Sequence, residues 1–395
     1  MQAPLQVRDR SDIPFGSSGI PFFGRSSEPA IIYFLPLIQK PNMSSTTPKK
    51  RLFLIDAMGY IFRAFFAPMD RLQTSAGVPT KVPYLFATMM RRVLENKERR
   101  PDYIAVVFDH AAPTFRDKLF AQYKAQRPPM PDDLSIQIPF VRRYCAAMRL
   151  PILEYPGYEA DDVIGTLARL ATDQQKGEKL EVFIVTSDKD LMQLVSKDVT
   201  ILNPTKNDLL IDENKVEEIM GVPPSKVADV MALMGDSIDN IPGARNPNDK
   251  PAPGERRKAG IGEVGARQLI QQYGSAEEAL KNAADVKRSS YREALQNCGE
   301  FVLLSKQLAT IPTDAPVLLD LNLMKMGPPD TEALRELYSE LGFTSLLREL
   351  APLTDDRKTD YLQFEMPAEM EKFLGTVRNG QEVAAWLTLD AQEPG

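Results

Sequence analysis

Leu52-Phe53-Leu54-Ile55-Asp56 (LFLID) is a short apolar run that ends in an aspartate. The same arrangement recurs at 103–108, which Asp109 follows, and at 182–186, which Asp188 follows after one serine. Each run is short and rich in β-branched and aromatic residues, as expected of a strand buried on both faces of a sheet. Helical patterns lie between the runs. This alternation predicts an α/β domain with a parallel sheet.

The rest of the chain divides by composition. Residues 1–48 are rich in Pro, Gly and Ser, which predicts a disordered tail, and Met43 is an alternative translation start. The α/β region is expected to span 49–215, and helical patterns without strands follow over 216–350. Residues 351–395 indicate a linker and the truncated start of a further domain, with a helix near Glu369 and a strand at 383–389. That fragment is too short to form a core alone.

Composition excludes several classes of site. The 395 residues include one histidine, His110, and two cysteines, Cys145 and Cys298, which cannot build a Cys₄ or Cys₂His₂ zinc site or a disulfide framework. So few cysteines suit a reducing cytosolic setting. No apolar run approaches the ~20 residues of a membrane span. Any bound metal must be held by some of the 54 Asp and Glu, which favours hard ions such as Mg²⁺ or Mn²⁺.

Nine acidic residues fall at positions that the predicted sheet would gather at one edge. In an open parallel sheet, ligands bind outside the carboxyl ends of the strands. Singly, each acid has an ordinary explanation as a helix cap or turn residue. Together they would repel one another unless cations lie among them. Two divalent ions about 4 Å apart, held by carboxylates, form the clamp of phosphodiester hydrolases. The set is Asp56, Asp109, Glu159, Asp161, Asp162, Asp188, Asp190, Asp236 and Asp239.

Basic and glycine-rich segments favour an anionic partner despite the net charge of -6, because patches rather than averages decide binding. Clustered bases with an aromatic residue suit a single-stranded phosphate backbone and a stacked base, although a solvated helix face is the alternative. The glycines of 260–265 would let backbone N–H groups approach a phosphate at a helix N-terminus, with a plain tight turn as the alternative. The basic segment contains Arg116, Lys118, Tyr123, Lys124 and Arg127.

Seven segments in a fixed order make the pattern specific: LIDAMGYIFRAFF, VVFDHAAPTFR, YKAQRPPMP, PGYEADDVIGTLA, TSDKDLMQL, GDSIDNIPG and GIGEVGARQLI. Over about residues 51–350 they resemble the 5′-nuclease (flap endonuclease-like) family, and most of all the N-terminal 5′→3′ exonuclease domain of bacterial DNA polymerase I. The resemblance implies a PIN-like parallel-sheet nuclease domain over 49–215. It further implies a helix-hairpin-helix-like DNA-binding subdomain over 216–350, a monomer, and a place in the bacterial cytosol and nucleoid.

The resemblance also implies roles for individual residues. The family's metal carboxylates fall on all nine acids, with the first five serving one ion and the last four the other. Lys124 and Arg127 would lie at the scissile phosphate as catalytic cations, whereas His110 would only pack or form a hydrogen bond. The further DNA contacts would be Arg63, Arg116, Tyr123, Gly260, Gly262 and Gly265. The family hairpin is tight, whereas residues 245–259 are inserted here, and we expect Arg256, Arg257 and Lys258 to contact phosphates.

The predicted function is therefore a Mg²⁺-dependent, structure-specific 5′→3′ exonuclease or flap endonuclease acting on DNA with a 5′ end or flap and on RNA-primed duplex, in lagging-strand replication and repair. One alternative is a catalytically inactive nuclease-like DNA-binding module, against which the complete carboxylate set argues. Another is the N-terminal fragment of a full DNA polymerase I, in which 351–395 would be the linker and the truncated start of a proofreading-exonuclease-like domain. A primase- or topoisomerase-like fold would also use an Asp-x-Asp loop, but the carboxylates after the first two strands do not suit it.

Overall fold

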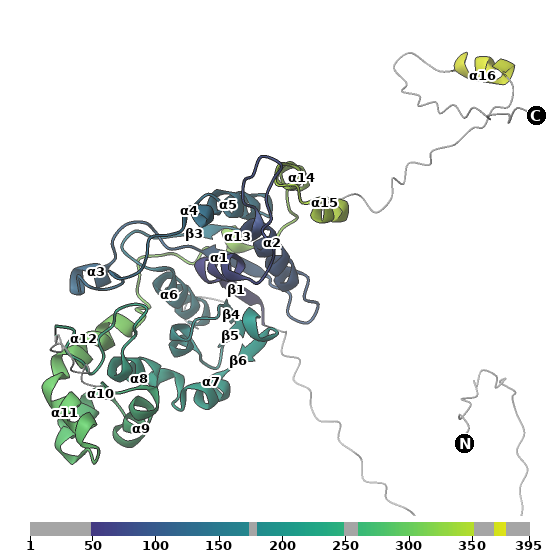
Figure 1. Ribbon diagram of the computed structural model, residues 1–395. Helices are drawn as coiled ribbons and strands as arrows, with labels where there is room; N and C mark the ends of the chain where they lie inside the picture. The colour runs from purple at the N-terminus through teal and green to yellow at the C-terminus, as the bar shows by residue number, and fades with distance from the viewer. Residues whose placement is uncertain (1–48, 174–179, 249–259, 351–366, 377–395) are drawn as a thin grey trace, which may run out of the picture. The chain divides into compact units, whose positions relative to one another are not determined.

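The computed structural model describes residues 49–173, 180–248, 260–350 and 367–376 (Figure 1). The tail over 1–48, the strand over 383–389, and Arg256, Arg257 and Lys258 lie outside these residues. Helix α16 (Pro367–Leu374) occupies the place of the helix expected near Glu369. None of the described helices is long and apolar enough to cross a membrane.

A six-stranded sheet in the order β3-β2-β1-β4-β5-β6 forms the centre of the α/β region. The first five strands are parallel, as predicted, and β6 pairs antiparallel with β5 at one edge. The three apolar runs are adjacent, since Leu52 pairs with Tyr103 on one side and with Val182 on the other. The strands are β1 (Arg51–Asp56), β2 (Tyr103–Val107), β3 (Ile152–Leu153), β4 (Glu181–Val185), β5 (Val199–Asn203) and β6 (Leu209–Ile211).

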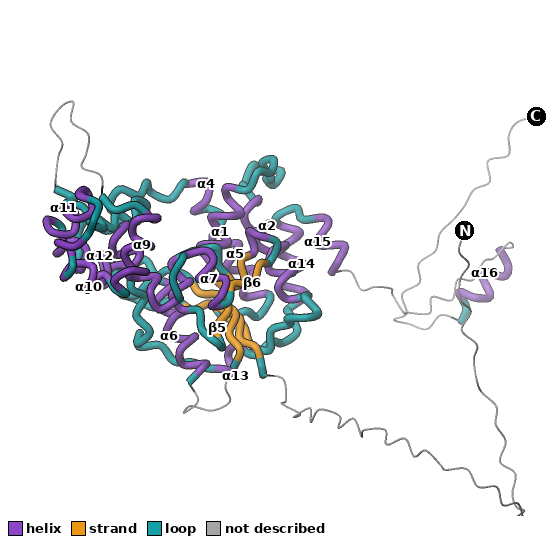
Figure 2. Tube along the Cα trace, turned by 90° about the horizontal axis from the view of Figure 1, so that it is seen from below, coloured by secondary structure: helices purple, strands orange, loops and turns teal. Residues whose placement is uncertain are grey.

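Alternate side chains of a strand point to opposite faces of the sheet, and both faces are covered. Phe53 and Ile55 of β1 pack in one apolar cluster, while Leu52 and Leu54 pack in the other, and all four are fully buried. Figure 2 shows the strands in orange with helices on either side. The helices of this region are α1 (Ala57–Phe66), α2 (Lys81–Leu94), α3 (Phe115–Leu119), α4 (Asp132–Ser135), α5 (Ile138–Ala147), α6 (Ala160–Thr172) and the 3₁₀ helices η2 (Asp190–Leu194) and η3 (Pro204–Lys206).

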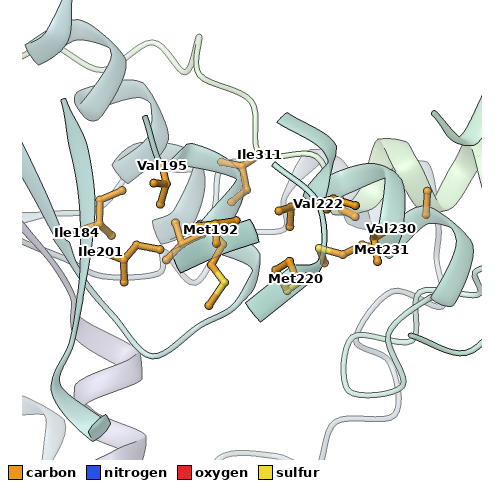
Figure 3. Packing of buried hydrophobic residues seen from close by; sticks show 14 of the residues in the cluster. Ile184, Met192, Val195, Ile201, Met220, Val222, Val230, Met231 and Ile311 are labelled. Atoms are coloured by element: carbon orange, nitrogen blue, oxygen red, sulfur yellow. The ribbon is translucent and has the colours of Figure 1, made fainter. Parts of the chain in front are cut away.

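After residue 215 the described chain is helical. The apolar helix α8 packs against α9 and α12, and the core of the sheet continues into this helical region without a break. Figure 3 shows that continuity: Ile184 and Ile201 lie at one end, Val230 and Met231 at the other, and Ile311 lies between. The elements are α7 (Glu213–Met220), η4 (Pro224–Lys226), α8 (Val227–Met234), α9 (Glu263–Tyr273), α10 (Ala276–Lys281), η5 (Ala283–Asp285), α11 (Ser289–Asn297) and α12 (Gly299–Ala309).

The last helices of the expected 216–350 subdomain return to the sheet. They are α13 (Leu321–Met324), α14 (Thr331–Glu340) and α15 (Thr344–Leu350). Leu334 and Leu337 of α14 are buried in the same cluster as Phe53. Helix α14 packs against α5, so its apolar stripe covers part of the α/β region, and the expected single helical subdomain over 216–350 is wrong in this respect.

Candidate metal centre and nucleic-acid interface

Aspartates follow the ends of three neighbouring strands. Asp56 ends β1 and caps α1: its Oδ1 accepts a 2.9 Å hydrogen bond from the Gly59 N–H. Asp109 follows β2, and its Oδ1 accepts a hydrogen bond from the Ala160 N–H at 2.8 Å. Asp188 follows β4. The strand order reverses between β1 and β4, which is the point where open α/β sheets bind their ligands.

Gly59 leaves no room beside Asp56. A Cβ atom at Gly59 would lie 2.3 Å from Oδ2 of Asp56. We predict that Gly59→Ala displaces this carboxylate and lowers both the affinity for Mn²⁺ and the turnover by about 10- to 100-fold, as loss of a ligand-orienting contact does elsewhere. Calorimetric titration with Mn²⁺ measures the first effect. Gly327→Ala is the matched control, because a Cβ there meets nothing within 4 Å; equal Mn²⁺ affinities in the two variants would contradict the prediction.

The N-terminus of α6 carries three acids with different roles. Asp162 is fully buried, and its two oxygens accept hydrogen bonds from Arg116 at 2.8 Å each. Its Oδ2 also accepts one from the Glu159 N–H at 2.9 Å, so Asp162 reaches back to cap its own helix. Its oxygens are taken up by the protein. The expectation that Asp162 is a metal ligand is therefore wrong, whereas Asp161 and Glu159 remain candidates.

The expected role of Arg116 is also wrong. It was expected to contact DNA, but its side chain is 3% exposed. Beyond Asp162, its Nε donates to the Leu308 carbonyl at 2.8 Å and its Nη2 to the Thr310 carbonyl at 3.2 Å. A buried carboxylate needs a paired cation, and Arg116 meets that need.

The second group of carboxylates lies on two loops. Asp190 begins η2, and its N–H donates to Oδ1 of Asp188 at 2.9 Å. Asp236 closes the other loop by pairing its backbone with Ile241, and its Oδ1 accepts from the Asp239 N–H at 3.0 Å. Hydrogen bonds within the turn therefore hold Asp236 in place, and Asp239 lies on the same loop.

The carboxylates of the two groups act on one another electrostatically. The pKa of Asp56 is raised to about 6, by burial first and, to a smaller extent, by the charges of Asp188 and Asp109. Burial also raises the pKa of Asp161 well above its usual range, again with a contribution from Asp188. The pKa of Asp190 is raised in the same way, by burial first and then by Asp188. Asp188 thus links both groups, and this joint repulsion marks a site suited to cations.

The chain places two of its own cations among these acids. Nζ of Lys124 lies 2.7 Å from Oε1 of Glu159 and 3.8 Å from Oδ2 of Asp239, and Arg127 pairs with Asp239. Lys124 has a left-handed backbone with φ of 52°, and its N–H donates to the Asp239 carbonyl at 2.9 Å. Strained backbone of this kind gathers at functional sites. Within the ranges described, no three acidic, His or Cys side chains are drawn together closely enough to enclose an ion.

Tyr123 differs from its expected role. It is 5% exposed within the apolar cluster, and its hydroxyl donates to Oε2 of Glu159 at 3.2 Å. Burial and the charge of Glu159 raise the pKa of this phenol, so it stays a donor. The expectation that Tyr123 stacks on a base is therefore wrong for this conformation. His110 forms a local hydrogen bond, since its Nδ1 accepts from the Ala112 N–H at 3.0 Å.

The remaining expected DNA contacts divide by exposure. Gly262 caps α9 and is exposed, and Gly260 lies against the side chain of Arg245. Gly265 is buried. A Cβ at this position would lie 2.4 Å from the hydroxyl oxygen of Tyr291, so no larger side chain fits here. Its role is close packing between helices, and the expectation of a DNA contact there is wrong. Arg63 is half-buried on α1.

Two residues of the site were missed by sequence reasoning. Thr186 donates from Oγ1 to Oδ2 of Asp56 at 2.9 Å and accepts from the Asp188 N–H at 3.0 Å, so it joins β1 to the loop after β4. Its place at the end of a strand, two residues before an aspartate, is the signal that could have found it. Asn240 has φ of 58° and donates from Nδ2 to the Gln122 carbonyl at 2.6 Å. Asparagine tolerates such a left-handed backbone better than most residues, which favours it in turns.

Known proteins resemble this chain over most of its length. Residues 51–221 match the family described as 5′-3′ exonuclease, N-terminal resolvase-like domain, and residues 258–332 match its C-terminal SAM fold. A 5′-3′ exonuclease of Aquifex aeolicus is 38% identical over 301 residues, which cover 76% of this chain and 95% of that protein. The chain belongs to the 5′-3′ exonuclease family. DNA polymerase I of Caldicellulosiruptor bescii is 38% identical over 306 residues, which cover 76% of this chain and only 33% of the polymerase.

Two solved structures share the fold. A 5′-exonuclease of bacteriophage T5 with bound zinc superposes with a TM-score of 0.51 at 17% identity, covering 77% of this chain and 100% of that one. A flap endonuclease of the same phage, in a complex with DNA and metal ions, gives a TM-score of 0.51 at 17% identity, covering 76% of this chain and 99% of the other. At these identities the likeness shows the fold alone.

Proposed function

We propose that this protein is a structure-specific 5′→3′ exonuclease and flap endonuclease that hydrolyses phosphodiesters of DNA, and of RNA primers, with two Mg²⁺ ions. The observation that carries the proposal is the meeting of two mutually repelling groups of carboxylates where the strand order reverses, beside Lys124 and Arg127. The biological task that follows is removal of primers and displaced flaps in replication and repair.

The donor set fits hard divalent cations, because every candidate ligand is a carboxylate oxygen. Asp56, Asp109, Glu159 and Asp161 would hold one ion, and the acids of the two later loops would hold the other. When bound, the pair of ions supplies an activated water and offsets charge on the attacking and leaving oxygens. With Asp162 committed to Arg116, eight of the nine predicted carboxylates remain for this role.

Lys124 and Arg127 bind and orient the phosphate in this proposal. Both are held beside Asp239, so a phosphate entering there meets two positive charges at once. When Lys124 and Arg127 turn from Glu159 and Asp239 towards the phosphate, the negative charge of the phosphate replaces that of the two carboxylates beside them. The exposed Gly262 at the start of the 11-residue helix α9 offers backbone donors and a favourable dipole to a phosphate of the duplex.

The proposal is tested with a labelled duplex bearing a 5′ flap, a matched 3′ flap and a blunt end. Cleavage of the 5′ flap with Mg²⁺, its loss with EDTA, and little action on the 3′ flap are expected. A wild-type protein that binds the flap but does not cut it with Mg²⁺ or Mn²⁺ would instead support the inactive DNA-binding module.

Lys124→Ala should lower turnover on the 5′ flap by about 100- to 1,000-fold, the usual loss when one donor to transition-state charge is removed. Stability should change by less than about 1 kcal/mol, because Lys124 is partly exposed and solvent screens its pairs. Single-turnover kinetics and thermal melting measure the two effects. Lys215→Ala, which removes a surface pair with Glu218 on α7, is the control for charge alone; equal turnover in both variants would contradict the assignment.

A further inference from the structure

The end of α12 and the segment that follows it are bound to the α/β region residue by residue. We name residues 308–315 the strap. The strap leaves the helical region, where Ser305 of α12 accepts a hydrogen bond from the Gly243 N–H at 2.8 Å, and it then runs beside α6 (Figure 1). Ile311 of the strap is buried between the sheet side and the helical side of the core (Figure 3). It lies so close to Gly165 of α6 that a Cβ there would stand 3.0 Å from Ile311.

Arg116 and Gln193 hold four consecutive residues of the strap in alternation. Arg116 donates to the carbonyls of Leu308 and Thr310 at 2.8 and 3.2 Å. Gln193 donates from Nε2 to the Ala309 carbonyl at 3.0 Å, and its Oε1 accepts from the Ile311 N–H at 2.9 Å. Three consecutive peptide groups, from Leu308 to Ile311, are thus bound by only two side chains.

Each of these two side chains also binds one of the two carboxylate-bearing elements. Arg116 holds Asp162, which caps the helix on which Asp161 stands. Gln193 donates from the same Nε2 to the carbonyl of Asp190 at 2.9 Å, at the start of η2. Asp161 of the first group and Asp190 of the second therefore stand on elements that are braced against the same four residues.

We propose that Arg116 and Gln193 are positioning residues: through the strap they fix the spacing between the carboxylates of α6 and those of η2. The proposal rests on the proposed function in that these carboxylates hold the ions. It predicts that loss of one brace lets the two groups separate, because their mutual repulsion is then opposed by fewer contacts. A metal pair needs that spacing before it can act on one phosphate.

Gln193→Met is the test variant, since methionine keeps the length of the side chain but makes none of these hydrogen bonds. We expect its Mn²⁺ affinity, measured by calorimetry without DNA, to fall by about 10- to 100-fold. Turnover at saturating flap DNA should fall by a similar factor while KM for DNA is unchanged. Arg116→Lys should recover part of the Mn²⁺ affinity lost in Arg116→Met, because lysine keeps a charge for Asp162 but cannot bind both it and the strap.

Arg169→Met is the matched control. Arg169 lies in the later half of α6 and donates to the Thr313 carbonyl of the strap at 2.6 Å, but the contacts described for it reach no carboxylate of the site. It should lower the melting temperature as Gln193→Met does and leave Mn²⁺ affinity unchanged. Equal Mn²⁺ affinities in Gln193→Met, Arg169→Met and wild type would overturn the proposal. If the wild type cuts no flap but Gln193→Met still has a weakened Mn²⁺ affinity, the proposed function is refuted and the positioning role of Gln193 is supported.

Discussion

Asp188→Asn is expected to reduce cleavage of the 5′ flap by on the order of 1,000-fold, because the metal's charge stabilisation is worth several kcal/mol and each ~1.4 kcal/mol is tenfold. Asp188 is the acid whose charge acts on both groups, through Asp56 and Asp161 on one side and Asp190 on the other. Asparagine keeps an oxygen that can accept the hydrogen bond from the Asp190 N–H, so the loop should be preserved. Quenched-flow measurement of single-turnover cleavage gives the factor.

The same variant should be more stable than wild type when no divalent ion is added. Removing one charge lowers the repulsion on three acids whose pKa values are raised, and a shift of one pKa unit is worth about 1.4 kcal/mol, so the gain should be on the order of 1 kcal/mol. Addition of Mg²⁺ or Mn²⁺ should stabilise wild type and leave Asp188→Asn nearly unchanged. Asp285→Asn, an exposed change on η5, is the control. Retained cleavage in Asp188→Asn would remove Asp188 from the metal centre.

Arg116→Met is expected to cost about 3 to 5 kcal/mol of folding free energy, the usual result of leaving a buried charge without its partner. Asp162 is 0% exposed and would keep only the Glu159 N–H of its present partners. Urea denaturation followed by circular dichroism measures the loss. Arg127→Met, which breaks a pair on an exposed cation, should cost less than about 1 kcal/mol.

The double variant Arg116→Met with Asp162→Asn separates charge from packing. A neutral asparagine needs no cation and can still cap α6, so the double variant should be more stable than Arg116→Met alone. Additive losses from the two substitutions would mean that the ion pair itself contributes little and that packing of the Arg116 side chain explains its burial.

The strands of the centre were predictable because their sequences carry the signal alone. Leu52 to Ile55 is apolar at every position, as burial on both faces requires, and parallel pairing brings the ends of three such runs to one edge. Strand β3 has only two residues, and its pairing with β2 comes from tertiary contact, so no local pattern announces it. The packing of α14 against α5 was hidden for a related reason, since its apolar stripe fits any apolar surface.

The site was predictable in its acids but not in its cations. Strand ends place Asp56 and Asp188 whatever surrounds them, whereas a run of bases does not tell which base is paired. The partners of Arg116 lie 46, 192 and 194 residues away in the sequence, beyond the range of any motif. Tyr123 is similar, because the Glu159 carboxylate that accepts its hydrogen bond lies 36 residues away in the sequence. The spacing of acidic residues can be recognised in the sequence, whereas the residues that pair with them can be identified only in the folded structure.

Gly235 and Gly243 lie back to back across the neck of the 236–241 loop. A Cβ on Gly235 would lie 2.5 Å from the Ile241 carbonyl oxygen, and one on Gly243 would lie 2.5 Å from the Gly235 nitrogen. The two ends of the loop are therefore in close contact at this neck. We expect that the chain length after Ala244, where the expected insertion of 245–259 begins, can vary without moving Asp236 and Asp239. A binding segment could therefore be inserted after Ala244 without disturbing the carboxylates of the loop.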